Sequence, residues 1–262
     1  MINRVRAVIF DWAGTVVDYG CFAPMHAFIQ TFEESGISIT VKEARGPMGL
    51  LKRDHIQAIL DMDRVKQVWV TQFSTEPKVH DVERLYERFE LHLMDALPHY
   101  TDPLPGVVDT VGLLRENGLK VGSTTGYTRK MMRVVHPKAK SKGYEPDFVV
   151  SADEVKVGRP APDMIFRNLT ELEVYPPQAA VKVGDTVADV REGKNAGVWS
   201  IAVIKGSSEL GLTKQEVDGL DATELQGRMD EVRKRFEEAG ADFVLSSIAQ
   251  LPEAIDLIQS RV

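Results

Sequence analysis

The chain has 262 residues, of which 43% are hydrophobic and 27% are charged, and it carries a formal net charge of −7 at pH 7. This composition indicates a globular protein with a full core, and its acidic balance argues against nucleic acid as a partner. The sequence has one cysteine, no apolar run near the roughly 18 residues of a membrane span, and no signal peptide before the first apolar segment. We therefore expect a soluble cytoplasmic protein without a disulfide or a membrane anchor.

Six short runs rich in β-branched residues predict the strands of a buried sheet. They lie at residues 5–10, 119–124, 148–150, 180–183, 199–204 and 242–245. Helical patterns lie between them, such as the apolar face of Val107, Val111 and Leu114, which precedes a stop signal at Gly118. Strands that alternate with helices predict an α/β fold, a Rossmann-like parallel sheet covered on both faces.

One long stretch interrupts this alternation. From about residue 21 to residue 97 there is no strand pattern, only helical periodicity such as that of Leu85, Phe89 and Leu93. The stretch is too long for an ordinary crossover within a compact domain. We therefore predict an inserted α-helical cap domain over residues 21–98, joined through turn-rich segments to a core domain of residues 1–20 and 99–262.

The residues that follow the predicted strands are the first to search for a site, because ligands of open parallel sheets gather at the carboxyl ends of the strands. Asp11 follows the first strand and Asp185 the fourth. Two carboxylates on one edge suit a hard cation such as Mg²⁺, and Asp11 could also attack phosphorus. A lone aspartate at such a position could equally be a helix cap.

Donors at the same edge could hold the oxygens of a phosphoryl group. The hydroxyl of Thr125, the backbone N–H groups around Trp12 and Gly126, and the guanidinium of Arg159 are candidates. Fixed donors of this kind stabilise the charge that develops in phosphoryl transfer. The edge therefore predicts a site that binds a small anion in an otherwise acidic protein.

Four of these segments, in this order, resemble the motifs of the haloacid-dehalogenase superfamily. They are Asp11-x-Ala13-Gly14-Thr15, Thr124-Thr125-Gly126, Arg159-Pro160 and Gly184-Asp185-x-x-x-Asp189. That superfamily places a helical cap between its first and second motifs, and its phosphatases usually carry a second aspartate two residues after the nucleophile. Ala13 stands at that position here and can do no acid–base work. Either the enzyme is catalytically impaired, or its leaving group needs no proton from that position.

A carbon leaving group fits the second possibility. A carbon–phosphorus bond breaks only if the departing electrons have a sink, and an imine β to phosphorus supplies one. Lys52 in the cap could form that imine, with Met48 one helical turn before it and His55 one turn after it. Apolar neighbours such as Leu51, and the charge of Arg53 or His55, would favour the neutral amine. Alternatively, Lys52 is a surface lysine of a mixed-charge helix.

Longer segments are similar to the phosphonoacetaldehyde hydrolase (phosphonatase) family. They are residues 10–15, 18–24, 48–52, 122–128, 183–186 and 206–211. The resemblance implies that phosphonoacetaldehyde is hydrolysed to acetaldehyde and phosphate through a Schiff base on Lys52 and an aspartyl-phosphate on Asp11. It also implies a magnesium ion held by Asp11, Asp185 and the backbone carbonyl of Ala13, a homodimer, and a role in 2-aminoethylphosphonate degradation.

Four further residues are predicted to support this chemistry. Cys21 lies at the cap joint and either lines the substrate pocket or fills space as a small packing residue. His55 and Tyr127 could tune Lys52 or order water, and Asp189 could orient its neighbours.

Two rival functions stay open. A phosphatase or phosphomutase of the same superfamily would expel oxygen, and Ala13 argues against that chemistry. A non-catalytic phosphate-binding scaffold is compatible with Ala13, whereas Asp11, Asp185 and Lys52 argue against it.

Overall fold

A six-stranded parallel sheet forms the centre of the computed structural model, which describes residues 4–260. The strand order is β3-β2-β1-β4-β5-β6. The strands are β1 (Ala7–Phe10), β2 (Lys120–Thr125), β3 (Phe148–Ser151), β4 (Ala180–Gly184), β5 (Trp199–Val203) and β6 (Phe243–Leu245). All six predicted strands are confirmed, with each end displaced by two residues at most.

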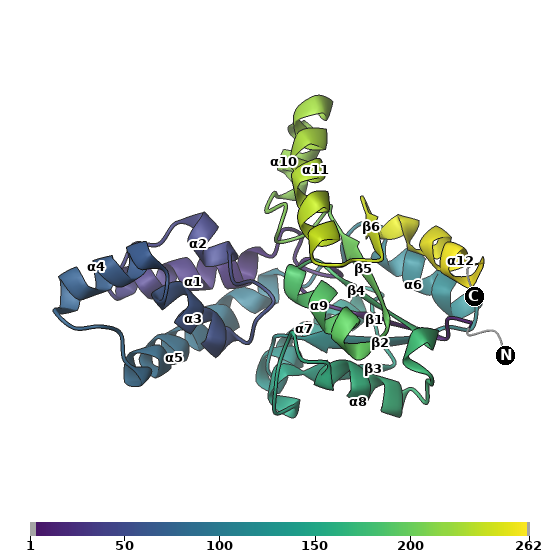
Figure 1. The fold of residues 1–262 in the computed structure, drawn as a ribbon, viewed down its shortest axis with the longest axis horizontal. Helices are drawn as coiled ribbons and strands as arrows, with labels where there is room; N and C mark the ends of the chain where they lie inside the picture. The colour runs from purple at the N-terminus through teal and green to yellow at the C-terminus, as the bar shows by residue number, and fades with distance from the viewer. Residues whose placement is uncertain (1–3, 261–262) are drawn as a thin grey trace.

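Helices cover both faces of the sheet (Figure 1). Along β1, Val8 and Phe10 pack into one apolar layer, whereas Ala7 and Ile9 pack into the other, as the alternation of a strand requires. The first layer contains α6 (Val107–Glu116), α7 (Arg129–Ser141) and α12 (Leu251–Ser260). Helices α8 (Asp163–Glu171), α9 (Val187–Ala196) and α11 (Ala222–Glu238) pack on the other side. The described chain also contains α10 (Lys214–Gly219) and the 3-10 turns η1 (Leu97–His99), η2 (Ala152–Glu154), η3 (Pro177–Ala179) and η4 (Ile248–Gln250).

Five helices between β1 and β2 form a separate bundle at one end of the core, drawn in purple and blue in Figure 1. They are α1 (Phe22–Glu34), α2 (Val41–Arg45), α3 (Lys52–Leu60), α4 (Asp63–Phe73) and α5 (Val79–Ala96). In their centre, the ring of Phe28 stacks on that of Phe89 with centroids 4.2 Å apart. The predicted α/β class with an inserted helical cap is thus confirmed, and the limits 21–98 stay a prediction. The first three and last two residues assigned to the core lie outside the described residues. Within residues 4–260, no helix has the length and apolar character needed to cross a membrane.

The connection between α2 and α3 differs from the prediction. Met48 does not share a helix with Lys52, because α3 begins at Lys52 itself and α2 ends at Arg45. The backbone leaves helical geometry between them: Gly49 has φ +90°, and Leu51 has ψ 140°. The predicted one-turn spacing of Met48 and Lys52 is therefore wrong.

The loop 46–51 packs tightly against the core. A Cβ atom on Gly49 would lie 2.5 Å from Thr186 Oγ1, and one on Gly158 would lie 2.5 Å from Leu51 Cδ2. Such distances are shorter than any ordinary contact, so these two glycines permit the cap loop and the core loops to meet.

The Phe28–Phe89 stack generates a stability prediction. Phe89→Ala removes a fully buried ring and should lower the free energy of unfolding of the cap by about 3–5 kcal/mol. Leu91→Ala on the same helix is the control; its side chain is 69% exposed, and the change should stay within about 0.5 kcal/mol. Urea unfolding of both variants measures the difference. Equal stabilities of the two variants would show that the stack does not hold the cap together.

Candidate active site

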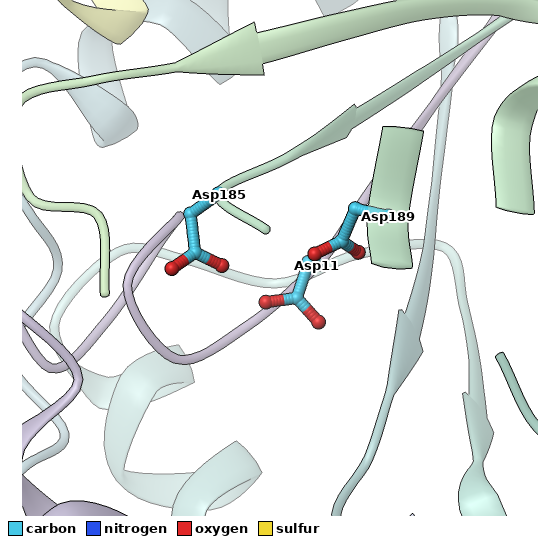
Figure 2. A group of neighbouring side chains, drawn as sticks. All are labelled: Asp11, Asp185 and Asp189. Carbon is cyan, nitrogen blue, oxygen red and sulfur yellow. The ribbon is translucent and has the colours of Figure 1, made fainter. Parts of the chain in front are cut away.

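Three carboxylates converge at the carboxyl edge of the sheet (Figure 2). Asp11 follows β1, Asp185 follows β4, and Asp189 lies in the first turn of α9. One oxygen from each lies within 4.8 Å of the others. Because β1 and β4 are neighbours in parallel register, the residues that end them lie side by side, as the sequence predicts.

Two buried cations form an ion-pair network with two of these carboxylates, Asp11 and Asp189, and with Glu192. Arg159 Nη1 lies 2.7 Å from Asp11 Oδ1 and 3.0 Å from Asp189 Oδ1, and its Nε lies 2.9 Å from Glu192 Oε2. Lys182 Nζ lies 3.0 Å from Asp189 Oδ1 and 3.2 Å from Glu192 Oε2. Burial opposes ionisation of Asp189, but the two cations lower its pKa below the usual range. Burial raises the pKa of Asp11, and the nearby charge of Arg159 acts in the opposite direction by lowering it.

Lys182 and Glu192 belong to this network although the sequence analysis did not select them. A signal was present for each. Lys182 is a charged residue inside the apolar run of β4, and Glu192 lies about one helical turn after Asp189. A charge in a buried strand requires a partner close by, so Lys182 in particular could have been found.

Asp185 differs from the other two carboxylates, because no basic side chain of residues 4–260 pairs with it. It accepts hydrogen bonds from Thr15 Oγ1 at 3.3 Å and from the backbone N–H of Ser208 at 2.8 Å. Burial, and then the proximity of Asp11, raise its pKa well above the usual value. A Cβ atom on Gly14 would lie 2.3 Å from Asp185 Oδ2, so glycine leaves the space beside this oxygen open.

This donor set fits a hard divalent cation between Asp11 and Asp185. Two buried carboxylates without enough positive charge around them require a cation or a proton, and oxygen donors suit Mg²⁺. Asp189 fits a ligand role less well, since its oxygens contact Arg159, Lys182 and Thr186. Ala13 lines the same pocket, beside Asp11.

Lys52, the first residue of α3, reaches the same pocket from the cap. It is 7% exposed, and Nζ lies 5.8 Å from the ring centroid of Phe28 and 5.6 Å from that of Tyr127. Among the described residues, no carboxylate pairs with Nζ within 4.0 Å. Burial lowers the pKa of Lys52 and raises those of Cys21 and Tyr127, which leaves both of these neighbours uncharged at neutral pH. The surroundings therefore favour a neutral amine.

The predicted source of positive charge beside Lys52 is wrong. Burial, and then Lys52 itself, lower the pKa of His55 well below the usual range, so its ring is uncharged at neutral pH. His55 Nε2 donates to the Ala44 carbonyl at 2.9 Å, and its ring stacks on Phe28. Arg53 points elsewhere and pairs with Glu83 at 2.6 Å. Arg159, from the core, is instead the cation that helps to lower the pKa of Lys52.

The pocket that joins these groups has a volume of about 30 Å³, room for a water molecule or two. Its lining contains most of the predicted site residues, namely Asp11, Ala13, Cys21, Met48, Lys52, Thr125, Gly126, Tyr127, Arg159 and Asp185, together with Gly49 and Thr186. Trp12, His55 and Asp189 lie behind this lining. The Trp12 indole is fully buried, and its Nε1 donates to Ser123 Oγ at 2.9 Å.

Comparison with known proteins agrees with this arrangement. The sequence profile of the haloacid dehalogenase-like hydrolases matches residues 5–197. The chain is 51% identical over 258 residues to the phosphonoacetaldehyde hydrolase of Bacillus cytotoxicus, covering 98% of each protein. It is 53% identical over 259 residues to a bifunctional phosphonoacetaldehyde hydrolase/aminoethylphosphonate transaminase of Clostridioides difficile; this match covers 99% of the chain and 41% of the relative.

A solved structure is similar along almost the whole chain. The crystal structure of a phosphonoacetaldehyde hydrolase-like protein from Oleispira antarctica has a TM-score of 0.96 and 35% identity, and the match covers 98% of this chain and 93% of the other. The chain therefore belongs to the haloacid dehalogenase-like hydrolases and, within them, to the phosphonoacetaldehyde hydrolase family. It is an enzyme of the hydrolase class.

The ion-pair network predicts a large loss of stability when one buried cation is removed. Lys182→Met leaves Asp189 and Glu192 with a single cation and should lower the free energy of unfolding by about 3–5 kcal/mol. Lys194→Met removes a lysine that is 43% exposed in its pair with Asp242 and should cost less than about 1 kcal/mol. Chemical denaturation of both variants compares the losses, and a Lys182→Met protein as stable as the wild type would contradict this account.

Asp18 at the first cap joint predicts a pH dependence of stability. Its buried carboxylate accepts the N–H groups of Phe22 at 2.8 Å and Ala23 at 3.0 Å, yet burial raises its pKa from 3.8 to about 7. Between these values the unfolded chain loses a proton that the folded chain keeps, so stability falls as pH rises from about 4 and the loss is complete above about 7.

Asp18→Asn removes this titration and should flatten the decline, which amounts to at most about 4 kcal/mol. Urea unfolding of wild type and variant at a series of pH values between 4 and 8 gives both profiles. Identical slopes in the two proteins would show that Asp18 ionises in the folded state as easily as in the unfolded one.

Proposed function

We propose that this enzyme hydrolyses the carbon–phosphorus bond of phosphonoacetaldehyde to acetaldehyde and phosphate. One observation carries the proposal: Lys52, a buried lysine without an ion-pair partner among the described residues, shares a small pocket with Asp11 and Asp185. Expulsion of oxygen by a phosphatase involves no imine and therefore requires no neutral amine at this position. The names of the relatives from Bacillus cytotoxicus and Clostridioides difficile support the same substrate.

Magnesium is the cofactor that suits the donors of this site. Asp11, Asp185 and the backbone carbonyl of Ala13 would hold it, in agreement with the unpaired state of Asp185. Bound there, Mg²⁺ would offset the repulsion between the Asp11 carboxylate and an anionic phosphonate.

The reaction begins on Lys52. Its neutral amine attacks the aldehyde carbon and the carbonyl oxygen leaves as water; one proton taken up from solvent gives the protonated imine. Burial contributes here by lowering the pKa of Lys52, which raises the fraction of nucleophilic amine at neutral pH. Cys21 and Tyr127 border the amine, and burial keeps both of them uncharged at neutral pH.

Asp11 then attacks phosphorus. The phosphorus–carbon electron pair moves into the imine to give an enamine, while an aspartyl-phosphate forms on Asp11. The carbon leaves without a proton, so Ala13 is sufficient where phosphatases need an acid. The Thr125 hydroxyl, Arg159 and nearby backbone N–H groups would hold the phosphoryl oxygens; Thr125 Oγ1 already accepts the Tyr127 N–H at 3.1 Å and keeps its own proton to donate.

Two hydrolytic steps complete the cycle. The enamine takes up a proton at carbon, and water cleaves the resulting imine into acetaldehyde and free Lys52. A second water attacks the aspartyl-phosphate and releases phosphate from Asp11. His55 and Asp189, which lie behind the pocket, would hold the cap loop and the Arg159 guanidinium in place.

Substrate entry requires the cap to move. A cavity of about 30 Å³ is too small for a two-carbon phosphonate, and the cap and core each supply part of its lining. We infer that the cap opens to admit substrate and closes to bring Lys52 to Asp11 and exclude water.

The biological setting follows from the proposed substrate. We place the enzyme in the cytoplasm, in 2-aminoethylphosphonate degradation, a place supported by the transaminase named together with the hydrolase in the Clostridioides difficile relative. We also propose that the enzyme forms a homodimer, and this proposal is based on the family resemblance alone.

Product formation from phosphonoacetaldehyde tests this function. Acetaldehyde and phosphate should appear in equal amounts with Mg²⁺, and chelation by EDTA should abolish both. Lys52→Met should fall to the rate without enzyme, whereas Lys66→Met, which alters an exposed cap lysine paired with Glu76, should retain wild-type turnover. Undiminished turnover by the Lys52→Met protein, or hydrolysis of phosphate esters in place of the phosphonate, would overturn the proposal.

A further inference from the structure

Arg45 lies where three parts of the molecule meet. It is the last residue of α2, and its Nη1 donates to the Gly20 carbonyl at 2.7 Å and to the Ser208 carbonyl at 3.2 Å. Gly20 belongs to the first joint between core and cap, and Ser208 to the core loop after β5. One cap side chain thus bonds both the joint and the core.

The core loop that Arg45 contacts also holds Asp185. The Ser208 N–H donates to Asp185 Oδ2 at 2.8 Å, and the Gly206 carbonyl accepts the Gly20 N–H at 2.7 Å. Gly20 is therefore bonded to this loop through its N–H and to Arg45 through its carbonyl. A displacement of the Arg45 side chain would remove its hydrogen bonds to the Gly20 and Ser208 carbonyls. These bonds lie next to Asp185, a proposed metal ligand.

The surroundings of Arg45 are shaped to receive a planar guanidinium. Its Cζ lies 4.8 Å from the centre of the Phe22 ring, within the range of a cation–π contact. A Cβ atom on Gly211 would lie 3.1 Å from Nε, and Gly211 has φ +66°. Nε and Nη2 are buried and donate no hydrogen bond within the described structure, so packing and the Nη1 bonds hold the group.

Arg45 is also connected to the Lys52 side of the pocket. The Arg45 carbonyl accepts the N–H of Met48 at 3.0 Å, and the carbonyl of the preceding residue, Ala44, accepts His55 Nε2 at 2.9 Å. Met48 lines the pocket, and His55 lies one turn beyond Lys52 on α3. The end of α2 thus fixes the loop that leads into Lys52.

We infer that Arg45 is a positioning residue that couples closure of the cap to the placement of Asp185. When the cap closes, the guanidinium bridges Gly20 and Ser208, which orders the loop that donates to Asp185 while the α2–α3 loop brings Lys52 into the pocket. The expected effect on turnover rests on the proposed function. The expected effect on the order of the loop around Ser208 rests on the geometry alone.

Arg64 provides a matched control. Arg45 and Arg64 both line the cleft of about 750 Å³ between α2 and the loop of Ser208 and Glu209. Arg64 pairs with Glu43 and donates to the Ser38 carbonyl at 2.9 Å, so its polar partners among the described residues belong to the cap. Arg64→Ala removes the same charge from the same cleft without removing a bond to the core.

The experiment compares Arg45→Ala with Arg64→Ala in steady-state kinetics and in hydrogen exchange. Arg45→Ala should lower kcat/KM for phosphonoacetaldehyde about 10- to 100-fold through the loss of charged hydrogen bonds, with partial recovery on addition of guanidinium ion. Arg64→Ala should stay within about twofold of wild type. Exchange of the backbone amides at residues 20–22 and 206–211 should accelerate in Arg45→Ala and not in Arg64→Ala.

Equal behaviour of the two variants in both measurements would overturn the inference. If Arg45→Ala does not fold by circular dichroism, Arg45→Met decides, because it keeps an apolar stem of similar length, removes the donors to Gly20 and Ser208, and should reproduce both effects. An inactive wild type would refute the proposed function instead, and the exchange comparison would still test the role of Arg45.

Discussion

Two buried cations, Arg159 and Lys182, lie among the buried carboxylates Asp11, Asp189 and Glu192, and the geometry of the site depends on this ion-pair network. Charges removed from water are costly unless they are paired, so the network can exist only if all its members occupy fixed positions. Because Arg159 contacts Asp11 directly, a side chain of the core orients the proposed nucleophile. Asp185 is left outside these pairs and remains available for a divalent cation.

The cap supplies what the core lacks. The carboxyl edge of the sheet carries Asp11, Asp185, Thr125 and Arg159, whereas the amine of Lys52 comes from α3 of the inserted bundle. The low polarity of the closed interface has opposite effects on the groups it encloses: it lowers the pKa of Lys52 and raises those of Cys21 and Tyr127. In the proposed reaction, closure of the cap would therefore both exclude water and favour the neutral, nucleophilic form of Lys52.

Much of this arrangement could be predicted from the sequence, because the signals were local. Each strand was a short β-branched run, and the residues after β1 and β4 had to meet once the sheet was parallel. The loop between α2 and α3 was missed because helical spacing alone cannot reveal that Gly49 adopts φ +90° and that α3 begins only at Lys52. The charge state of His55 was missed because it depends on tertiary burial against Phe28 and on the nearby Lys52. Lys182 had a readable signal, but its partners are determined by contacts between separate elements.

Borohydride reduction during turnover tests most directly whether Lys52 forms the imine. Imine formation on Lys52 should give one modified lysine, Lys52, mapped by mass spectrometry of the digested protein. With EDTA the adduct should keep its phosphonate group, because the imine forms before the carbon–phosphorus bond breaks; with Mg²⁺ it should be an ethyl group left after cleavage. Labelling spread over exposed lysines, or turnover without any adduct on Lys52, would contradict the account and leave the buried lysine without a chemical role.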